Sequence, residues 1–295
     1  MKSNKLEFFI KHRVFVIVSF LLMAITVIAF SLVYTNGSSK AGSTSLNLSE
    51  KQLLLLNNYI YLENASKRGA IINNIDTLKA NADSKTLCIL TEIENDPVLS
   101  NLVIVDSINN EVKAICMVPE NRTHIKNAEA VIIYQGTNTL DTSYLETLKV
   151  SSQSETNIQL VAGDFHEKCE LNYNVTNVSG HSIGGNLAQY VTITNGYNVR
   201  NCVSFNGHGF TQEFIDTYKS NITMNAQKIV SISSYKEPLH TIQTSVASNE
   251  IFVNTPDELD PISSHNASVL YNKTHFDKYG MYKPEILTEE IAQTN

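Results

Sequence analysis

The chain has 295 residues, 42% of them hydrophobic and 17% charged, a composition that supports one large folded domain and excludes a chain that is disordered as a whole. Lys and Arg number 22 against 29 Asp and Glu, and no basic cluster stands in the body of the chain, which argues against a nucleic-acid partner. The four cysteines lie far apart with no C-x-x-C pair, which excludes a zinc ribbon and a disulfide-dense small domain.

The first segment of the chain is a long apolar run. From Val14 to Tyr34 no residue is charged, and about 20 such residues span about 30 Å of hydrocarbon as a helix. The flank before it, residues 1–13, carries four basic residues against one acid, so the positive-inside rule places this flank in the cytoplasm and the rest of the chain outside. The run is longer than the apolar core of a cleavable signal and lacks a small-x-small end. We therefore predict a transmembrane anchor over residues 14–34, with secretion after cleavage as the alternative.

The remainder divides into a linker and one domain. Residues 35–46 are rich in Gly, Ser, Thr and Asn and lack periodicity, which predicts a flexible linker. The domain is expected over residues 47–295. Near its start, Ser49 followed by Gln52 forms a capping-box signature that predicts a helix through residue 61, and a second helix is expected over residues 69–80.

Short runs rich in β-forming residues follow. Residues 102–105 and 111–117, joined by a polar connection, predict a hairpin. Residues 130–134 form an uninterrupted apolar run that breaks into Gln135-Gly136-Thr137. This is how a fully buried strand of a parallel sheet ends in a functional loop.

Beyond this strand, helices and strands alternate. We expect helices over residues 144–150, 185–194 and 210–219, and strands over residues 158–162, 175–178, 202–205, 228–233 and 250–254. The alternation predicts an α/β fold with a mostly parallel central sheet. Such sheets bind their ligands at the carboxyl ends of the strands, so a functional site is expected there.

A glycine-rich segment, Gly180-His181-Ser182-Ile183-Gly184-Gly185, stands between a predicted strand and a predicted helix. It fits the pattern G-x-S-x-G, in which glycines flank a serine on a turn too sharp for larger side chains. A serine held there exposes its hydroxyl at the edge of the sheet, at a helix N-terminus whose N–H groups favour a developing oxyanion. The pattern therefore predicts a nucleophile elbow with Ser182 as the nucleophile.

The residues around this motif resemble a known family. The run from Val178 to Ala188, VSGHSIGGNLA, resembles the elbow of the class 3 lipase-like α/β-hydrolases. Residues 132–137, IIYQGT, resemble the strand of that family that ends in F-R-G-T. Residues 52–61 and 205–210 also resemble the bacterial lipase-like members, and the similarity spans about residues 48–275.

This resemblance implies an α/β-hydrolase fold and a serine hydrolase of the lipase or esterase type, which cleaves carboxylic esters through an acyl-enzyme at Ser182. The implied oxyanion hole comes from the backbone N–H groups of Thr137 and Ile183. The implied substrate is a lipid or a small ester, and the reaction needs no metal or organic cofactor. Two positions depart from the family, because Gln135 replaces the usual arginine and His208 stands where proline is common.

A serine nucleophile needs a base, and in this fold the chain order is serine, acid, histidine. The histidines after Ser182 are His208, His240, His265 and His275. His265 follows the last predicted strand and matches the place where the family carries its histidine, so we predict His265 as the base, with His275 as the alternative. His181 is too close in sequence to serve, and we expect it to pack beside the elbow.

The acid of the triad must orient the imidazole and stabilise its charged form. Glu237 follows the predicted strand over residues 228–233, where the fold places its acid, although the family generally has aspartate there. We predict Glu237 for this role, with Asp257 and Asp260 as alternatives.

The sequence leaves other functions open. A hydrolase fold that had lost its acid would be a catalytically inactive binding module, because a fold does not by itself grant activity. A thioesterase, peptidase or acyltransferase would use the same triad, because triad geometry does not choose the acyl group. The predicted anchor places the catalytic domain on the extracytoplasmic side of the membrane in each case.

The cysteines of an exported domain should either pair or be buried. We expect burial of Cys88, Cys116, Cys169 and Cys202, because Cys202 lies in a predicted core strand and Cys88 adjoins two apolar residues.

Overall fold

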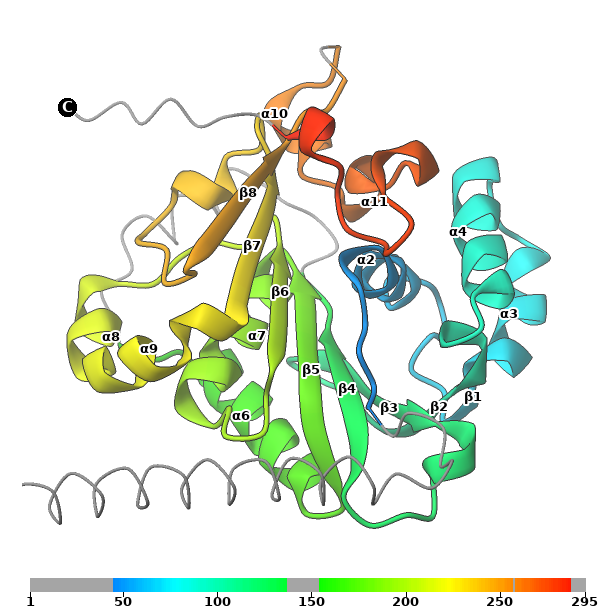
Figure 1. Cartoon of the computed structure of the whole chain (residues 1–295), viewed down its shortest axis with the longest axis horizontal. Helices are drawn as coiled ribbons and strands as arrows, with labels where there is room; N and C mark the ends of the chain where they lie inside the picture. Colours follow the sequence, from blue (N-terminus) through cyan, green and yellow to red (C-terminus); the bar gives the residue numbers. More distant parts are fainter. Residues whose placement is uncertain (1–44, 137–153, 257, 288–295) are drawn as a thin grey trace, which may run out of the picture. The chain divides into compact units, whose positions relative to one another are not determined.

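An eight-stranded sheet covered by helices on both faces forms the described part of the chain (Figure 1). The computed structural model describes residues 45–136, 154–256 and 258–287. Several predictions lie outside these ranges; they concern the flank over residues 1–13, the anchor over residues 14–34, residues 35–44 of the linker, Thr137, the helix over residues 144–150 and Asp257. Among the helices within the ranges, none has the length and hydropathy that a membrane span needs.

The strands follow one another across the sheet in chain order. Their bounds are β1 Gly69–Ala70, β2 Leu102–Asn109, β3 Lys113–Pro119, β4 Ala128–Tyr134, β5 Tyr173–His181, β6 Asn201–Phe205, β7 Ile229–Ser234 and β8 Asn249–Val253. Neighbours from β1 to β4 pair antiparallel, and those from β4 to β8 pair parallel. The predicted α/β architecture is confirmed, but the sheet is mixed rather than mostly parallel. Its first three pairs are antiparallel, and the chain passes from β2 to β3 and from β3 to β4 without an intervening α-helix.

Helices cover the two faces in two groups (Figure 1). One face carries α2 Glu50–Tyr59, α3 Ile71–Lys79, α4 Ser84–Asn95 and α11 Ala267–Leu270, and the other carries α6 Asn157–Glu170, α7 Ile183–Thr194, α8 Gln212–Thr217 and α9 Lys219–Asn225. Successive side chains of a strand point to opposite faces, so β4 contributes Ile133 to the core against α2 and Ile132 to the core against α7. Burial of β4 on both faces explains its unbroken apolar sequence.

Two helices show how caps decide local structure. The predicted capping box at the start of α2 is present, with Ser49 and Gln52 bonded reciprocally. The strand expected over residues 158–162 is wrong, because these residues lie in α6. A second capping box, formed by Thr156 and Gln159, starts that helix, and a short apolar run does not by itself distinguish a strand from a buried helix.

Two further expectations need correction. No helix was predicted over α4, although Asp83 caps it by accepting a hydrogen bond from the Thr86 N–H. The burial expected of all four cysteines is wrong for Cys88, which is exposed on α4, whereas the other three are buried. All four are free thiols in the structure.

Candidate active site

Ser182 lies at the turn between β5 and α7. Its backbone has φ 61° and ψ −129°, a left-handed conformation that is uncommon for any residue except glycine. A Cβ on Gly180 would lie 1.9 Å from the carbonyl oxygen of Gly184, and a Cβ on Gly184 would lie 2.2 Å from that of Tyr134. Both flanking positions therefore require glycine, as the motif predicts.

Glu237 is buried just beyond β7. Its Oε2 accepts hydrogen bonds from His265 Nδ1 at 3.0 Å and from the Leu239 N–H at 2.9 Å. Its Oε1 accepts from His240 Nδ1 at 3.0 Å and from the His240 N–H at 2.8 Å. Burial raises the pKa of Glu237, but the hydrogen bonds from His240 and His265 outweigh burial and hold this pKa at about 2. The carboxylate is therefore ionised at neutral pH and acts as an acceptor only.

His265 directly follows a short helix, α10 Pro261–Ser264. Because the ionised Glu237 accepts from Nδ1, the uncharged imidazole carries its proton on Nδ1 and keeps a lone pair on Nε2. His265 Nε2 and Ser182 Oγ are both buried, and neither has a hydrogen-bond partner among the described residues. A hydroxyl and a basic nitrogen are the groups that a nucleophile and its base supply. The hydrogen bond between a nucleophile and its base is often long or absent in unliganded sites.

Ser182 is more enclosed than the sequence predicts. The motif led us to expect an exposed hydroxyl, whereas the whole residue is buried. The chain just after β4 packs against it, since a Cβ on Gly136 would lie 2.7 Å from the Ser182 Cβ. Among the described residues, Gly136 is thus one of those that enclose Ser182.

Of the two predicted oxyanion donors, Ile183 lies within the described residues. Ile183 begins α7, and the first N–H groups of a helix have no partner inside it. Thr137 lies outside the described residues, but its neighbour Gly136 is held beside Ser182. The Gly136 N–H donates to Tyr61 Oη at 3.1 Å.

The alternative triad residues lie elsewhere. Asp260 caps α10, where its Oδ1 accepts from the N–H groups of Ile262 and Ser263. His275 belongs to a separate turn, Lys273–His275, whose last carbonyl accepts from the Lys283 N–H. His208 is buried and bonds through Nδ1 to the Gly209 carbonyl at 2.9 Å. Among the described candidates, the structure brings Glu237 and His265 into contact.

Sequence reasoning named His240 among the histidines after Ser182 but assigned no role to it or to Tyr61. His240 shares the carboxylate of Glu237, and its position three residues after an acid was the available signal. Tyr61 lies beyond the end of α2, far in sequence from Gly136 and His181, and the resemblance of residues 52–61 assigned it no role. His181 was expected to pack beside the elbow, and it does so while also forming hydrogen bonds to Tyr61 and to the His265 carbonyl.

A cavity of about 470 Å³ opens beside this cluster. Its lining includes Tyr61, His181 and His265, together with Ile262 and residues of α4, among them Ile89. Its volume is typical of sites that hold a small organic molecule. Within the described ranges, no group of three or more His, Cys, Asp or Glu residues is placed to hold a metal ion.

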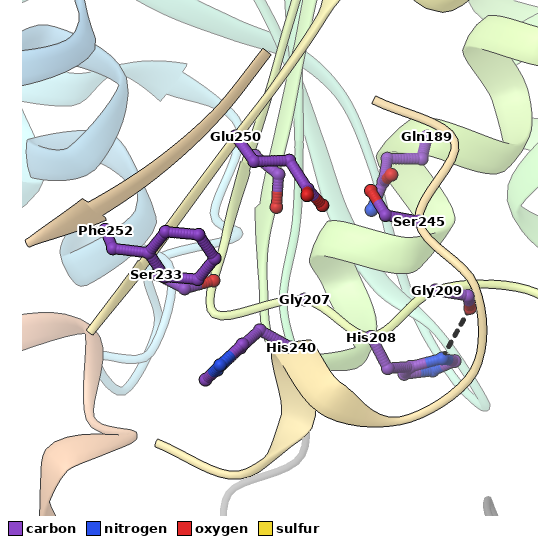
Figure 2. A pocket seen from close by; sticks show the side chains of 10 residues that line it. Gln189, Gly207, His208, Gly209, Ser233, His240, Ser245, Glu250 and Phe252 are labelled. Atoms are coloured by element: carbon purple, nitrogen blue, oxygen red, sulfur yellow. Dashed lines mark hydrogen bonds between the residues drawn. The ribbon is translucent and has the colours of Figure 1, made fainter. Parts of the chain in front are cut away.

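A much smaller cavity, of about 10 Å³, is lined by His240 (Figure 2). His208, Ser233 and Phe252 also line it. This volume accommodates about one water molecule. The buried His208 Nε2 and Ser233 Oγ lack partners among the described residues, so a bound water would satisfy groups next to the histidine that braces Glu237.

Residues 104–254 match the family model described as Mbeg1-like, and this match covers half of the chain. The chain belongs to the Mbeg1-like family. Lip2 lipase from Yarrowia lipolytica is similar in structure over 73% of this chain and 80% of its own, with 14% sequence identity and a TM-score of 0.42. No curated protein matches the sequence. The predicted lipase-like resemblance is confirmed for this Mbeg1-like chain at the level of family and fold, and the nearer resemblance to bacterial members stays a prediction.

Proposed function

We propose that this protein is a serine hydrolase of the lipase or esterase type, which cleaves carboxylic esters through an acyl-enzyme at Ser182. The observation that supports it most is the contact between the ionised Glu237 and His265 Nδ1. This contact leaves Nε2 as the basic nitrogen of a ring whose centroid lies 4.8 Å from that of His181, the residue before Ser182. Ser182 Oγ and His265 Nε2 are buried without partners among the described residues. Each such group lowers the stability of the fold by about 1–3 kcal/mol, a cost that a role in catalysis explains.

In the proposed first step, Ser182 Oγ forms a bond to the ester carbonyl carbon and gives its proton to His265 Nε2. The carbonyl oxygen becomes an oxyanion, for which the N–H groups of Ile183 and Thr137 are the proposed donors. Glu237 stabilises the imidazolium. The bond to the leaving alkoxide then breaks, and the departing oxygen takes the proton from Nε2.

The second step regenerates the serine. Water gives a proton to His265 Nε2 as its oxygen bonds to the acyl carbon, and the resulting intermediate releases the carboxylic acid while Ser182 Oγ recovers the proton. The cavity beside His265 is the proposed place for part of the ester. Its mixture of apolar and polar walls suits a small or medium ester with a short apolar chain.

We also propose that the reaction takes place outside the cytoplasm, with residues 14–34 as a membrane anchor. The support is the charge-free run from Val14 to Tyr34 behind a basic flank. The substrate would then be a lipid or a small ester that is present at or near the outer face of the membrane.

Turnover of a p-nitrophenyl ester series tests the proposed chemistry. Ser182→Ala and His265→Ala should each lower kcat by at least about 10³-fold, and the double variant should be little worse, because members of a triad act as a unit. Ser233→Ala is the matched control, since Ser233 Oγ is also buried without a partner in the part of the chain that the structure describes but lies outside the proposed triad. Unchanged turnover in Ser182→Ala would remove the serine-hydrolase assignment, and a chain without esterase activity would favour the binding module.

A further inference from the structure

Tyr61 and His181 form a hydrogen-bonded chain between two parts of the site. The Gly136 N–H donates to Tyr61 Oη at 3.1 Å, and Tyr61 Oη lies 2.7 Å from His181 Nδ1. His181 Nε2 lies 2.6 Å from the carbonyl oxygen of His265. These hydrogen bonds thus connect Gly136, the residue before the proposed oxyanion donor, to the backbone of His265, the proposed base.

The partners determine the direction of each hydrogen bond. A carbonyl oxygen accepts only, so the proton of His181 lies on Nε2 and donates to His265. His181 Nδ1 is then an acceptor in the uncharged ring. Burial raises the pKa of Tyr61, so its hydroxyl keeps its proton and donates it to Nδ1 while Oη accepts from Gly136.

The surroundings keep His181 uncharged. Its ring is buried, and the ring centroids of His181 and His265 are 4.8 Å apart. Burial, together with the charge of His265, lowers the pKa of His181 to about 3, although the His265 carbonyl and Glu237 act in the opposite direction. The titratable groups that face His181 are Tyr61, His265 and Glu237.

We propose that Tyr61 and His181 are positioning residues, which together hold the His265 carbonyl and the Gly136 N–H in fixed places relative to Ser182. This inference rests on the proposed function, because it assigns a task to these residues in that reaction. The uncharged state of His181 also favours the proposed reaction. His265 becomes cationic when it takes the serine proton, and a second cation with its ring centroid 4.8 Å away would oppose this step.

A second donor sets the size of the expected effect. Asn206 Nδ2 also donates to the His265 carbonyl, at 2.7 Å. The carbonyl therefore keeps one anchor when His181 is changed, and the base is displaced rather than released. A displacement of about 1 Å in an active site can cost about 100-fold in rate, so losses of about 10- to 100-fold are expected.

Two substitutions of His181 separate its two hydrogen bonds. In His181→Gln the amide nitrogen reaches the place of Nε2 and can still donate to the His265 carbonyl. In His181→Asn the shorter amide reaches the place of Nδ1, so it meets Tyr61 but leaves the carbonyl. We expect His181→Asn to lower kcat at least about 10-fold more than His181→Gln, with KM little changed. Equal losses in the two variants, or losses confined to KM, would overturn the proposal.

Tyr61→Phe tests the other half of the chain. It removes the donor to His181 and the acceptor of the Gly136 N–H, so kcat should fall about 10-fold or more. Tyr134→Phe is the matched control, because Tyr134 Oη also makes a buried hydrogen bond, to the Ala162 carbonyl at 3.1 Å, away from the cluster. A loss of kcat in Tyr134→Phe as large as that in Tyr61→Phe would contradict a specific role.

Imidazole nitrogen NMR on the folded wild-type protein tests the hydrogen bonds of His181 without measuring activity. His181 should carry its proton on Nε2 and show no titration between about pH 5 and 8. A proton on Nδ1, or titration within that range, would overturn the proposal even if every variant failed to fold. Retained turnover in Ser182→Ala would instead defeat the proposed function and leave this NMR result standing, so the two failures are distinguishable.

Discussion

Replacing Glu237 with glutamine removes the charge of the proposed acid while keeping its size. In the structure each carboxylate oxygen accepts two hydrogen bonds, one from a histidine ring and one from a backbone N–H. A glutamine has one accepting oxygen, so its amide nitrogen must face a donor on one side. The side of His240 can relax more easily, because that ring is 20% exposed whereas the ring of His265 is 7% exposed.

The size of the effect follows from the pKa of Glu237. Its environment lowers this pKa from 4.5 to about 2, which corresponds to about 3 kcal/mol of stabilisation of the ionised carboxylate at about 1.4 kcal/mol per unit. If most of this attraction acts on the imidazolium of the transition state, its loss lowers kcat by about 10²-fold. If the glutamine instead turns its nitrogen to His265, the imidazole adopts the wrong tautomer and the loss approaches about 10⁴-fold.

Steady-state kinetics on an activated ester measures this loss, and Glu237→Asp is the matched variant. Aspartate keeps the charge and shortens the side chain by one methylene, so Glu237→Asp should retain more activity than Glu237→Gln. A fall of less than about threefold in Glu237→Gln would refute the reasoning, as would an aspartate variant that is no better than the glutamine variant.

Three further predictions concern packing, thiols and topology. Gly184→Ala should destabilise the fold by more than about 3 kcal/mol in urea unfolding, because its Cβ would lie 2.2 Å from a backbone oxygen. The control Gly163→Ala lies in α6, where the nearest atom to the new Cβ is 3.6 Å away, and should be neutral or stabilising. Equal effects of the two substitutions would contradict this packing. Cys88 should react with a maleimide in the native state and the other three cysteines only after denaturation, so rapid native labelling of all four would contradict their burial. Protease added to intact cells should digest the part after residue 35, and full protection of that part would refute the proposed anchor.

Glu237 also makes stability depend on pH in a definite direction. Its pKa is lowered on folding, so its contribution is fully present above about pH 4.5 and is lost as the pH falls towards about 2. Unfolding measured through this window should show a steeper loss in the wild type than in Glu237→Gln. Parallel curves would show that the charge of Glu237 is not stabilised in the folded state.

Local patterns predicted most of the elements that position the site. The G-x-S-x-G segment indicated the turn at Ser182, because the crowding at Gly180 comes from Gly184 within the same segment, whereas the crowding at Gly184 comes from the distant Tyr134. The position of Glu237 followed from the end of β7, and this order along the chain outweighed its departure from the usual aspartate. The strand wrongly expected over residues 158–162 shows the limit, since helix and strand compete in short apolar runs and the cap at Thr156 decided the outcome.

The contacts around the proposed base were less predictable. The hydrogen bonds of Tyr61 to Gly136 and His181 join residues 75 and 120 positions apart, and the bond from His181 to His265 spans 84. Such pairings depend on how α2 and α10 pack at the sheet edge, which no local pattern encodes. The burial of Ser182 has the same origin, because the chain around Gly136 covers it from a distant part of the sequence.

Covalent trapping with a fluorophosphonate tests whether Ser182 is an activated nucleophile. The adduct is detected by mass spectrometry of the intact protein and of its peptides. The probe forms a bond to an activated serine oxygen and loses fluoride, so the account predicts one adduct per chain, on the peptide that contains Ser182. The adduct should form far more slowly in His265→Ala. Absence of the adduct in the folded wild type, or an adduct on another residue, would contradict the account.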